Sequence, residues 1–225
     1  MKLSLAEELL LLSLNDEKGS VLFAASTGLP FGLAGAVLME LAVQEKIKLE
    51  GKKILSAGDG DTGDAILDEC LGLLRAAAKP KTIQHWISKL GGRKSIREGY
   101  LERLVQKFIL RREEHKILWV FPATRFPASN PIEELEVRQR LRKAAFAEAL
   151  PDLPTLLLIS LVQACGLVGD VFPDRDERKQ AKKRFAALAK EEVYGKAVAD
   201  QIAAVMAACI AACSAATIAA TAAHH

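Results

Sequence analysis

Basic residues crowd one stretch of the chain and are its clearest candidates for binding chemistry. There are seven between positions 93 and 112: Arg93, Lys94, Arg97, Arg103, Lys107, Arg111 and Arg112. The first three follow Gly91-Gly92, where a loop is expected to lead into a helix. Unpaired N–H groups at a helix start attract anions, and neighbouring cations strengthen the attraction. Taken by itself the strip is more typical of an ordinary solvated helix face, and an anion site suited to a phosphate group is the alternative.

A second cluster consists of four carboxylates: Asp59, Asp61, Asp64 and Asp68. A calcium-binding EF-hand loop needs glycine at its sixth position and glutamate at its twelfth, where this chain has Asp64 and Cys70. We therefore expect Asp61 or Thr62 to cap the helix that follows. A pair of these carboxylates performing acid–base catalysis is the weaker alternative.

Neither the cysteines nor the histidines form a metal or redox motif. The cysteines, which are Cys70, Cys165, Cys209 and Cys213, each lie in an apolar run, so we expect reduced core thiols. His224 and His225 end the chain as a pair typical of an expression tag and carry no functional argument. Nucleophile, P-loop and zinc-protease motifs are absent from the sequence. We predict no metal, no cofactor and no enzymatic activity.

The composition is typical of a globular protein without a strong preference for nucleic acid. The net charge is only +3, and aromatic residues make up 5% of the chain, which is few for a base-stacking surface. No residue from 201 to 223 is charged, and twelve of these residues are alanine. Alanine gains little from burial in lipid, so a helix packed within the protein is favoured and a membrane span is the alternative.

Apolar residues recur at helical spacing, which predicts a mainly α fold: one single-domain helical bundle over residues 1–223, with one or two short β-hairpins. Ser4 and Glu7 match a capping box before a helix at about 5–14. Because that apolar run contains Glu7 and Glu8, no signal peptide is expected. Residues 21–23 are predicted as a short strand and 28–32 as a loop. Helices are expected from Thr82 and Ser95, after Asn130-Pro131, and over 155–168.

Two hairpins are predicted. The first has strands at 47–50 and 54–55, and the second has strands at 108–110 and 117–121 around a charged tip at 111–116. A helix followed by the second hairpin resembles a winged arrangement. The alternative function is therefore a winged-helix-like protein or nucleic-acid interaction module without lipid binding, although a second basic helix in recognition position is missing.

Five motifs in the same order resemble the Golgi phosphoprotein 3 family. They are LAEELLLL at 5–12, GLAGAVLMELA at 32–42, TGDAILDE at 62–69, QHWI at 84–87 and LVQK at 104–107. The resemblance runs from residue 3 to about 210 and is strongest before residue 125. The abundance of alanine and the short N-terminus are more typical of a prokaryotic member, for which another anionic lipid would replace the Golgi lipid.

The resemblance implies a peripheral membrane adaptor. Family members bind the phosphatidylinositol 4-phosphate headgroup, carry protein cargo and form homo-oligomers, so the expected partners are an anionic phospholipid, a membrane surface, cargo and a second copy. A cytoplasmic, peripherally membrane-associated location follows, with nucleic acid not favoured.

The resemblance also implies site residues. Lys94 and Arg97 match two family arginines that hold the headgroup, and Arg93 lies beside them. Leu29, Pro30 and Phe31 would form a membrane-facing loop. Ala25 and Ala34 stand where the family has a pocket tryptophan and a pocket arginine.

Overall fold

Helices make up most of the described structure, which confirms the predicted mainly α fold. The computed structural model describes residues 2–117, 121–188 and 203–215. Side chains are described for all of these residues except 115–117 and 121–122. The helices are α1 (Leu5–Ser13), α2 (Leu29–Val43), α3 (Ala65–Arg75), α4 (Ile83–Gly91), α5 (Lys94–Gln106), α6 (Ile132–Phe146), α7 (Leu153–Ala164), α8 (Val168–Val171) and α9 (Arg175–Leu188). A further helix covers 203–215. The strands are β1 (Ile47–Glu50), β2 (Lys53–Ser56), β3 (Lys81–Thr82), β4 (Glu113–Ile117) and β5 (Phe121–Arg125).

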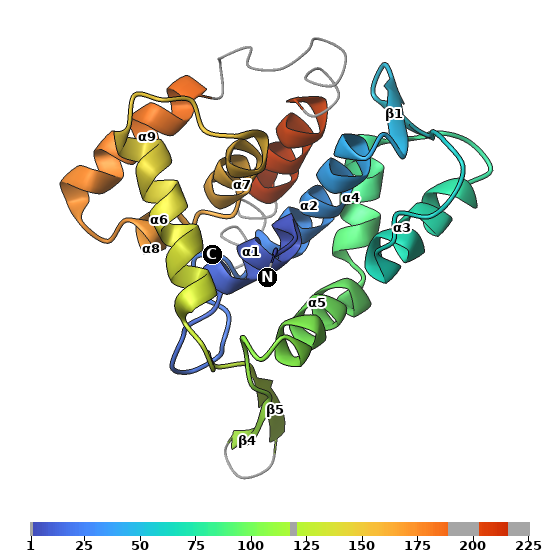
Figure 1. The fold of residues 1–225 in the computed structure, drawn as a ribbon. Helices are drawn as coiled ribbons and strands as arrows, with labels where there is room; N and C mark the ends of the chain where they lie inside the picture. Colours follow the sequence, from blue (N-terminus) through green and yellow to red (C-terminus); the bar gives the residue numbers. More distant parts are fainter. Residues whose placement is uncertain (1, 118–120, 189–202, 216–225) are drawn as a thin grey trace, which may run out of the picture.

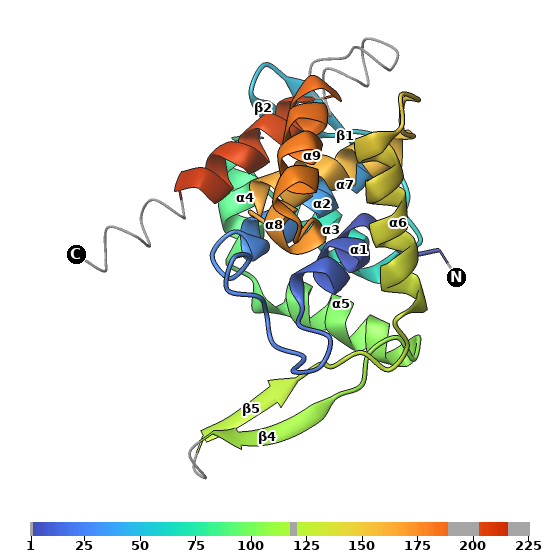
Figure 2. The same cartoon turned by 90° about the vertical axis from the view of Figure 1, so that its left-hand side faces the viewer.

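Two apolar helices, α1 and α2, lie at the centre of the molecule (Figure 1). All residues of α1 are buried, and α1 packs against α2, α5, α6 and α7. A helix that is apolar on every side must be covered on every side, and Figure 2 shows the other helices arranged around this pair. The predicted capping box is confirmed: the Ser4 N–H donates to Glu7 Oε2 (2.7 Å), and the Glu7 N–H donates to Ser4 Oγ (3.3 Å).

The segment that leads into α2 differs from its prediction. Residues 21–23 form no strand, and only an isolated bridge joins Val21 to Leu14. The predicted loop at 28–32 is also wrong, because α2 begins at Leu29 with Pro30 in its first turn. Proline suits a first helical turn, where the missing N–H would have no acceptor anyway. The Gly-Leu-Pro cluster thus starts a helix, although it was expected to interrupt one.

The first hairpin is confirmed and gains a third strand. β1 pairs antiparallel with β2, and β2 pairs with β3. Thr82 ends β3 and caps α4 by accepting a hydrogen bond from the His85 N–H (3.2 Å), so the predicted helix start is also confirmed.

The second hairpin forms, but with different strands. β4 and β5 pair from Glu113 opposite Arg125 to Ile117 opposite Phe121, so the charged residues 113–116 lie in a strand. The tip, residues 118–120, falls outside the described residues. The hairpin projects from the helical body (Figure 2). A two-stranded ribbon in water buries neither face, so charged side chains are tolerated along it.

The alanine-rich helix packs on the core in its described part, residues 203–215. Val205, Cys209, Ala212 and Cys213 are buried along one face. The four cysteines are buried, as predicted. No helix in the described ranges is both long and apolar enough to cross a membrane. The predicted packing of this helix within the protein is therefore supported for residues 203–215. Residues 216–223 lie outside the described structure.

Candidate functional site

The junction between α4 and α5 carries the predicted anion-binding residues. α5 begins at Lys94, one residue earlier than predicted, with Arg93 as its N-cap and no side-chain hydrogen bond at that cap. Lys94 and Arg97 are exposed and three residues apart, so they lie on neighbouring turns of one helix face. Neither has a hydrogen bond or ion pair to any described residue. Arg93 is half-buried and pairs with Glu69 of α3 (2.9 Å).

The other basic residues of the strip are already neutralised within the protein. Arg103 pairs with Asp64, Lys107 with Glu7 (2.6 Å), Arg111 with Glu113 (2.6 Å) and Arg112 with Glu102 (3.8 Å). The Lys107–Glu7 pair joins residues that are 100 positions apart in the sequence. The strip therefore contains two unpaired cations among the described residues, and sequence spacing could not separate them from the paired ones.

The α4–α5 junction lies against the start of α2. A Cβ atom added to Gly91 would lie 3.1 Å from Pro30 O and 3.2 Å from Phe31 Cδ1, so glycine permits this close approach. The fold thus brings residues 29–31 beside the junction that leads into α5. Leu29 is nevertheless only 1% exposed, and Pro30 and Phe31 are partly buried in a helix. The predicted loop is wrong for these residues, because they form the first turn of α2, and their contact with a membrane stays a prediction. Phe23, in the preceding turn, is the large apolar side chain that is 96% exposed.

The two alanines at family pocket positions are inside the protein. Ala25 and Ala34 are both fully buried. A long charged side chain at either position would need room that this packing does not leave. The positive charge available to an anion in this region therefore comes from the start of α5.

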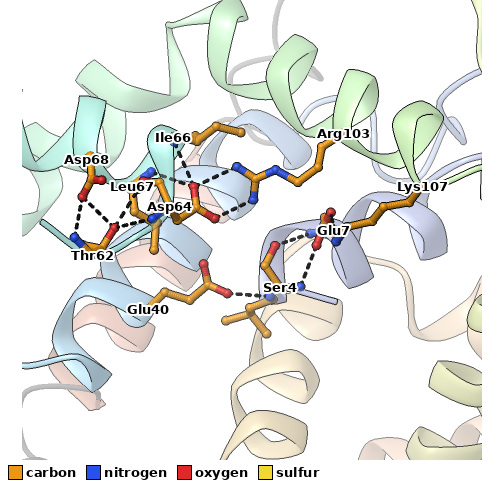
Figure 3. A network of polar contacts seen from close by, with 11 residues as sticks. Ser4, Glu7, Glu40, Thr62, Asp64, Ile66, Leu67, Asp68, Arg103 and Lys107 are labelled. Carbon is orange, nitrogen blue, oxygen red and sulfur yellow. Dashed lines mark hydrogen bonds and ion pairs between the residues drawn. The ribbon is translucent and has the colours of Figure 1, made fainter. Parts of the chain in front are cut away.

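The aspartate cluster forms a capping network (Figure 3). Asp64 caps α3 by accepting hydrogen bonds from the N–H groups of Ile66 (2.9 Å) and Leu67 (3.2 Å), so the prediction of Asp61 or Thr62 as the cap is wrong. Arg103 of α5 donates two hydrogen bonds to the Asp64 carboxylate. Thr62 donates to Asp68 through its N–H (2.6 Å) and its hydroxyl (2.7 Å).

These contacts decide the charge of the cluster. Burial alone would raise the pKa of Asp64, but the hydrogen bonds from Arg103 and the backbone outweigh it and hold the pKa below its usual range. The Thr62 hydroxyl likewise lowers the pKa of Asp68. Both groups are thus ionised at neutral pH and unsuited to delivering a proton, and the two hydrogen bonds from Arg103 let Asp64 join α3 to α5.

A further carboxylate, Glu40, was not singled out from the sequence. It is the one charged residue within α2, and a lone acid in an apolar helix is the signal that could have marked it. One of its oxygens, Oε1, accepts a hydrogen bond from the Leu5 N–H at the start of α1 (2.6 Å). Its Oε2 is buried with no hydrogen-bond partner among the described residues. Burial raises the pKa of Glu40 to about 7.

Replacing Glu40 by glutamine is expected to make stability less sensitive to pH. The pKa of Glu40 is about 7 in the folded protein and near 4.5 when exposed, so the folded state binds the extra proton between these values. The parent therefore loses stability as pH rises through this window. Glu40→Gln removes that loss and should raise the free energy of unfolding at pH 8 by about 1–2 kcal/mol, with little change at pH 4. Urea unfolding at both pH values measures this, and an equal effect at both would contradict it.

Comparison with known proteins finds one matching family model and a sequence relative. A family model described as Golgi phosphoprotein 3 (GPP34) matches residues 5–205. Vacuolar protein sorting-associated protein 74 of Eremothecium gossypii is 28% identical over 161 residues. That match covers 62% of this chain and 48% of the relative, so the chain spans about half the length of the curated relative.

Proposed function

Because this chain belongs to the Golgi phosphoprotein 3 family, we propose that it is a peripheral membrane adaptor that holds an anionic phospholipid headgroup at the start of α5. One observation carries the proposal: Lys94 and Arg97 are exposed and unpaired among the described residues, at the N-terminal turn of a 13-residue helix. Backbone N–H groups of the first turn and two cations lie within four residues of each other there, a combination that suits a phosphate group.

Arg93 adds a third cation at the edge of this site. Its ion pair to Glu69 fixes the guanidinium beside the helix start, and its Nε is buried without a hydrogen-bond partner among the described residues. An anion at the N-cap would supply an acceptor on this side. Phosphatidylinositol 4-phosphate is the ligand that family membership favours. The buried alanines at positions 25 and 34 leave fewer charged contacts to distinguish it from other anionic lipids.

Weak attachment through one headgroup fits an adaptor that gains affinity from more than one contact. A single charged site on a membrane surface is reversible, and a second contact through cargo or another copy multiplies the affinity. Phe23 is an apolar side chain available for the interface itself, because it is almost fully exposed. The winged-helix alternative has less support, since the cations leading to the hairpin are occupied in ion pairs.

The test is co-sedimentation with phosphatidylcholine vesicles that contain either no anionic lipid, phosphatidylserine or phosphatidylinositol 4-phosphate. A basic residue near an anionic surface contributes about 1 kcal/mol, so Lys94→Ala/Arg97→Ala should weaken binding about 30-fold. Phosphatidylcholine alone should pellet little of either protein.

A matched control removes the same amount of charge elsewhere. Arg111→Ala/Arg112→Ala deletes two exposed cations that already have carboxylate partners, and it should retain most of the binding. If both double variants lose binding equally, the effect is one of general charge and the assigned site is wrong. A duplex-DNA mobility shift at low salt is expected to show no complex; a clear one would favour the nucleic-acid alternative.

A further inference from the structure

A cleft at the other end of α2 has the properties of a small-molecule site. Its volume is about 480 Å³, within the range of ligand pockets. It lies between the N-terminal turns of α1, α3 and α7, the C-terminal end of α2, and α6. Its walls are largely apolar, with side chains of Leu3, Val43, Leu67, Leu153, Pro154 and Leu157. Glu40 lies about ten residues along α2 from the anion site, a distance of roughly 15 Å, so the two sites are separate.

The charged groups of the cleft leave two carboxylates, Glu40 and Asp152, without a cationic partner among the described residues. Four acidic residues line it (Glu8, Glu40, Asp64 and Asp152), against two basic residues, Lys2 and Arg140. Arg140 pairs with Glu8, and Asp64 pairs with Arg103. Asp152 caps α7 through the Thr155 N–H (3.0 Å). Glu40 has the Leu5 N–H on one oxygen, while its second oxygen is buried and has no donor among the described residues.

A buried carboxylate oxygen without a donor is costly, and a ligand that brings a donor would remove that cost. In Figure 3 the Glu40 side chain extends from α2 towards the first turn of α1, next to the Asp64 network. The apolar walls provide contact area for an aliphatic stem, and the net negative lining favours a cation over an anion at its end. Burial raises the pKa of Glu40 to about 7, so most of the group is ionised at pH 8, and a cation beside it would favour the ionised form further.

We propose that this cleft binds a small amphiphilic amine, whose ammonium group pairs with the Glu40 carboxylate and whose aliphatic stem lies against the apolar walls. This site is independent of the headgroup site. Its occupant would bridge α1, α2 and α7, so binding should also stabilise the folded chain.

The test uses three probes of one chain length: n-hexylammonium, n-hexanol and n-hexanoate, titrated at pH 8 into the full chain and followed by NMR chemical shifts of the cleft residues. Hexylammonium should bind best, hexanol about tenfold more weakly, and hexanoate more weakly still. Equal binding of hexanol and hexylammonium would overturn the proposal.

Three variants locate the interaction. Glu40→Gln should bring hexylammonium down to the affinity of hexanol, whereas Glu136→Gln, an exposed glutamate on α6, should change nothing. Val43→Phe, which narrows the cleft and retains the Glu40 carboxylate, should weaken binding of all three probes. Unchanged hexylammonium binding in this variant would place the ligand elsewhere and refute the site. Lys94→Ala/Arg97→Ala should bind hexylammonium as the parent does. Failure of the cleft proposal can therefore be distinguished from failure of the headgroup proposal.

Discussion

Replacing Asp64 by alanine is expected to lower the free energy of unfolding by about 3 kcal/mol. The variant loses the cap of α3, which contributes about 1 kcal/mol, and it leaves Arg103 partly buried without its partner, at a cost of about 2 kcal/mol. The Asp64 and Arg103 side chains are 21% and 24% exposed, so solvent relieves only part of that cost. Equilibrium unfolding in urea at pH 7 measures the change.

Related variants separate the two contributions. Asp64→Asn retains a good capping side chain but loses the charge, so it should recover about 1 kcal/mol relative to alanine. Once Asp64 is alanine, adding Arg103→Ala should cost little more, because the pair is already broken. Asp61→Ala is the control: Asp61 is exposed, and its loss should change stability by less than about 0.5 kcal/mol. If Asp61→Ala were the more harmful change, the cap assigned by the structure would be wrong.

The effect of Asp64 should also depend on pH in a defined direction. Its pKa is lowered in the folded protein, so its contribution is present above the usual aspartate value near 3.8 and is lost as pH falls through the lower folded value. The parent and Asp64→Ala should therefore converge at strongly acidic pH. The stabilising effect of Glu40 is instead lost as pH rises, because its pKa is raised in the folded protein. Unfolding measured over one pH series therefore distinguishes the two carboxylates.

The second large effect is expected at Gly35, where the alanine-rich helix crosses α2. A Cβ atom at this position would lie 2.5 Å from Cys209 Sγ and 3.1 Å from Cys209 Cβ. Gly35→Ala must therefore push residues 203–215 away from α2, at a cost of about 2 kcal/mol. Gly72→Ala is the matched control, because Gly72 is exposed inside α3 and nothing lies within 4 Å of its added Cβ. That variant should gain about 0.5–1 kcal/mol, so the two substitutions should have opposite signs.

Thiol labelling gives this prediction a second readout. Cys209 and Cys213 are buried at the same contact, so a thiol reagent should react slowly with the native parent and much faster with Gly35→Ala. Gly72→Ala should label as slowly as the parent. If Gly35→Ala instead proved stabilising, like Gly72→Ala, the contact between Gly35 and the helix at 203–215 would be contradicted.

The adaptor proposal and the cleft place two chemistries at opposite ends of α2. The N-terminal end lies beside an exposed pair of cations, and the C-terminal end carries the one carboxylate of the helix. A membrane headgroup and a small amine are recognised by opposite charges, so neither ligand would compete for the other site. Vesicle co-sedimentation and the hexylammonium titration can therefore be run on the same variants, because a change at one site should not alter binding at the other.

Sequence patterns determined the local features of this protein. The mainly α fold, the capping box at Ser4, the helix start at Thr82 and the first hairpin depend on residues a few positions apart, whose interactions form in almost any tertiary setting. The same holds for family membership, because ordered motifs survive in the sequence itself. The cluster at 28–32 is an exception: its sequence predicts a loop, but α2 begins at Leu29. A proline gives the same local signal in a loop and in the first turn of a helix.

Only the tertiary structure decided which charged residues are available. Arg103 and Asp64 are 39 positions apart, and Lys107 and Glu7 are 100 positions apart, so no local spacing shows that these cations are occupied while Lys94 and Arg97 are not. It likewise decided that Asp64, and neither Asp61 nor Thr62, caps α3, that residues 29–31 form the first turn of α2, and that Glu40 has one oxygen without a donor among the described residues. The physical reason is that ion pairing and desolvation depend on which distant segments the fold brings into contact, whereas helix propensity and capping depend on neighbours along the chain.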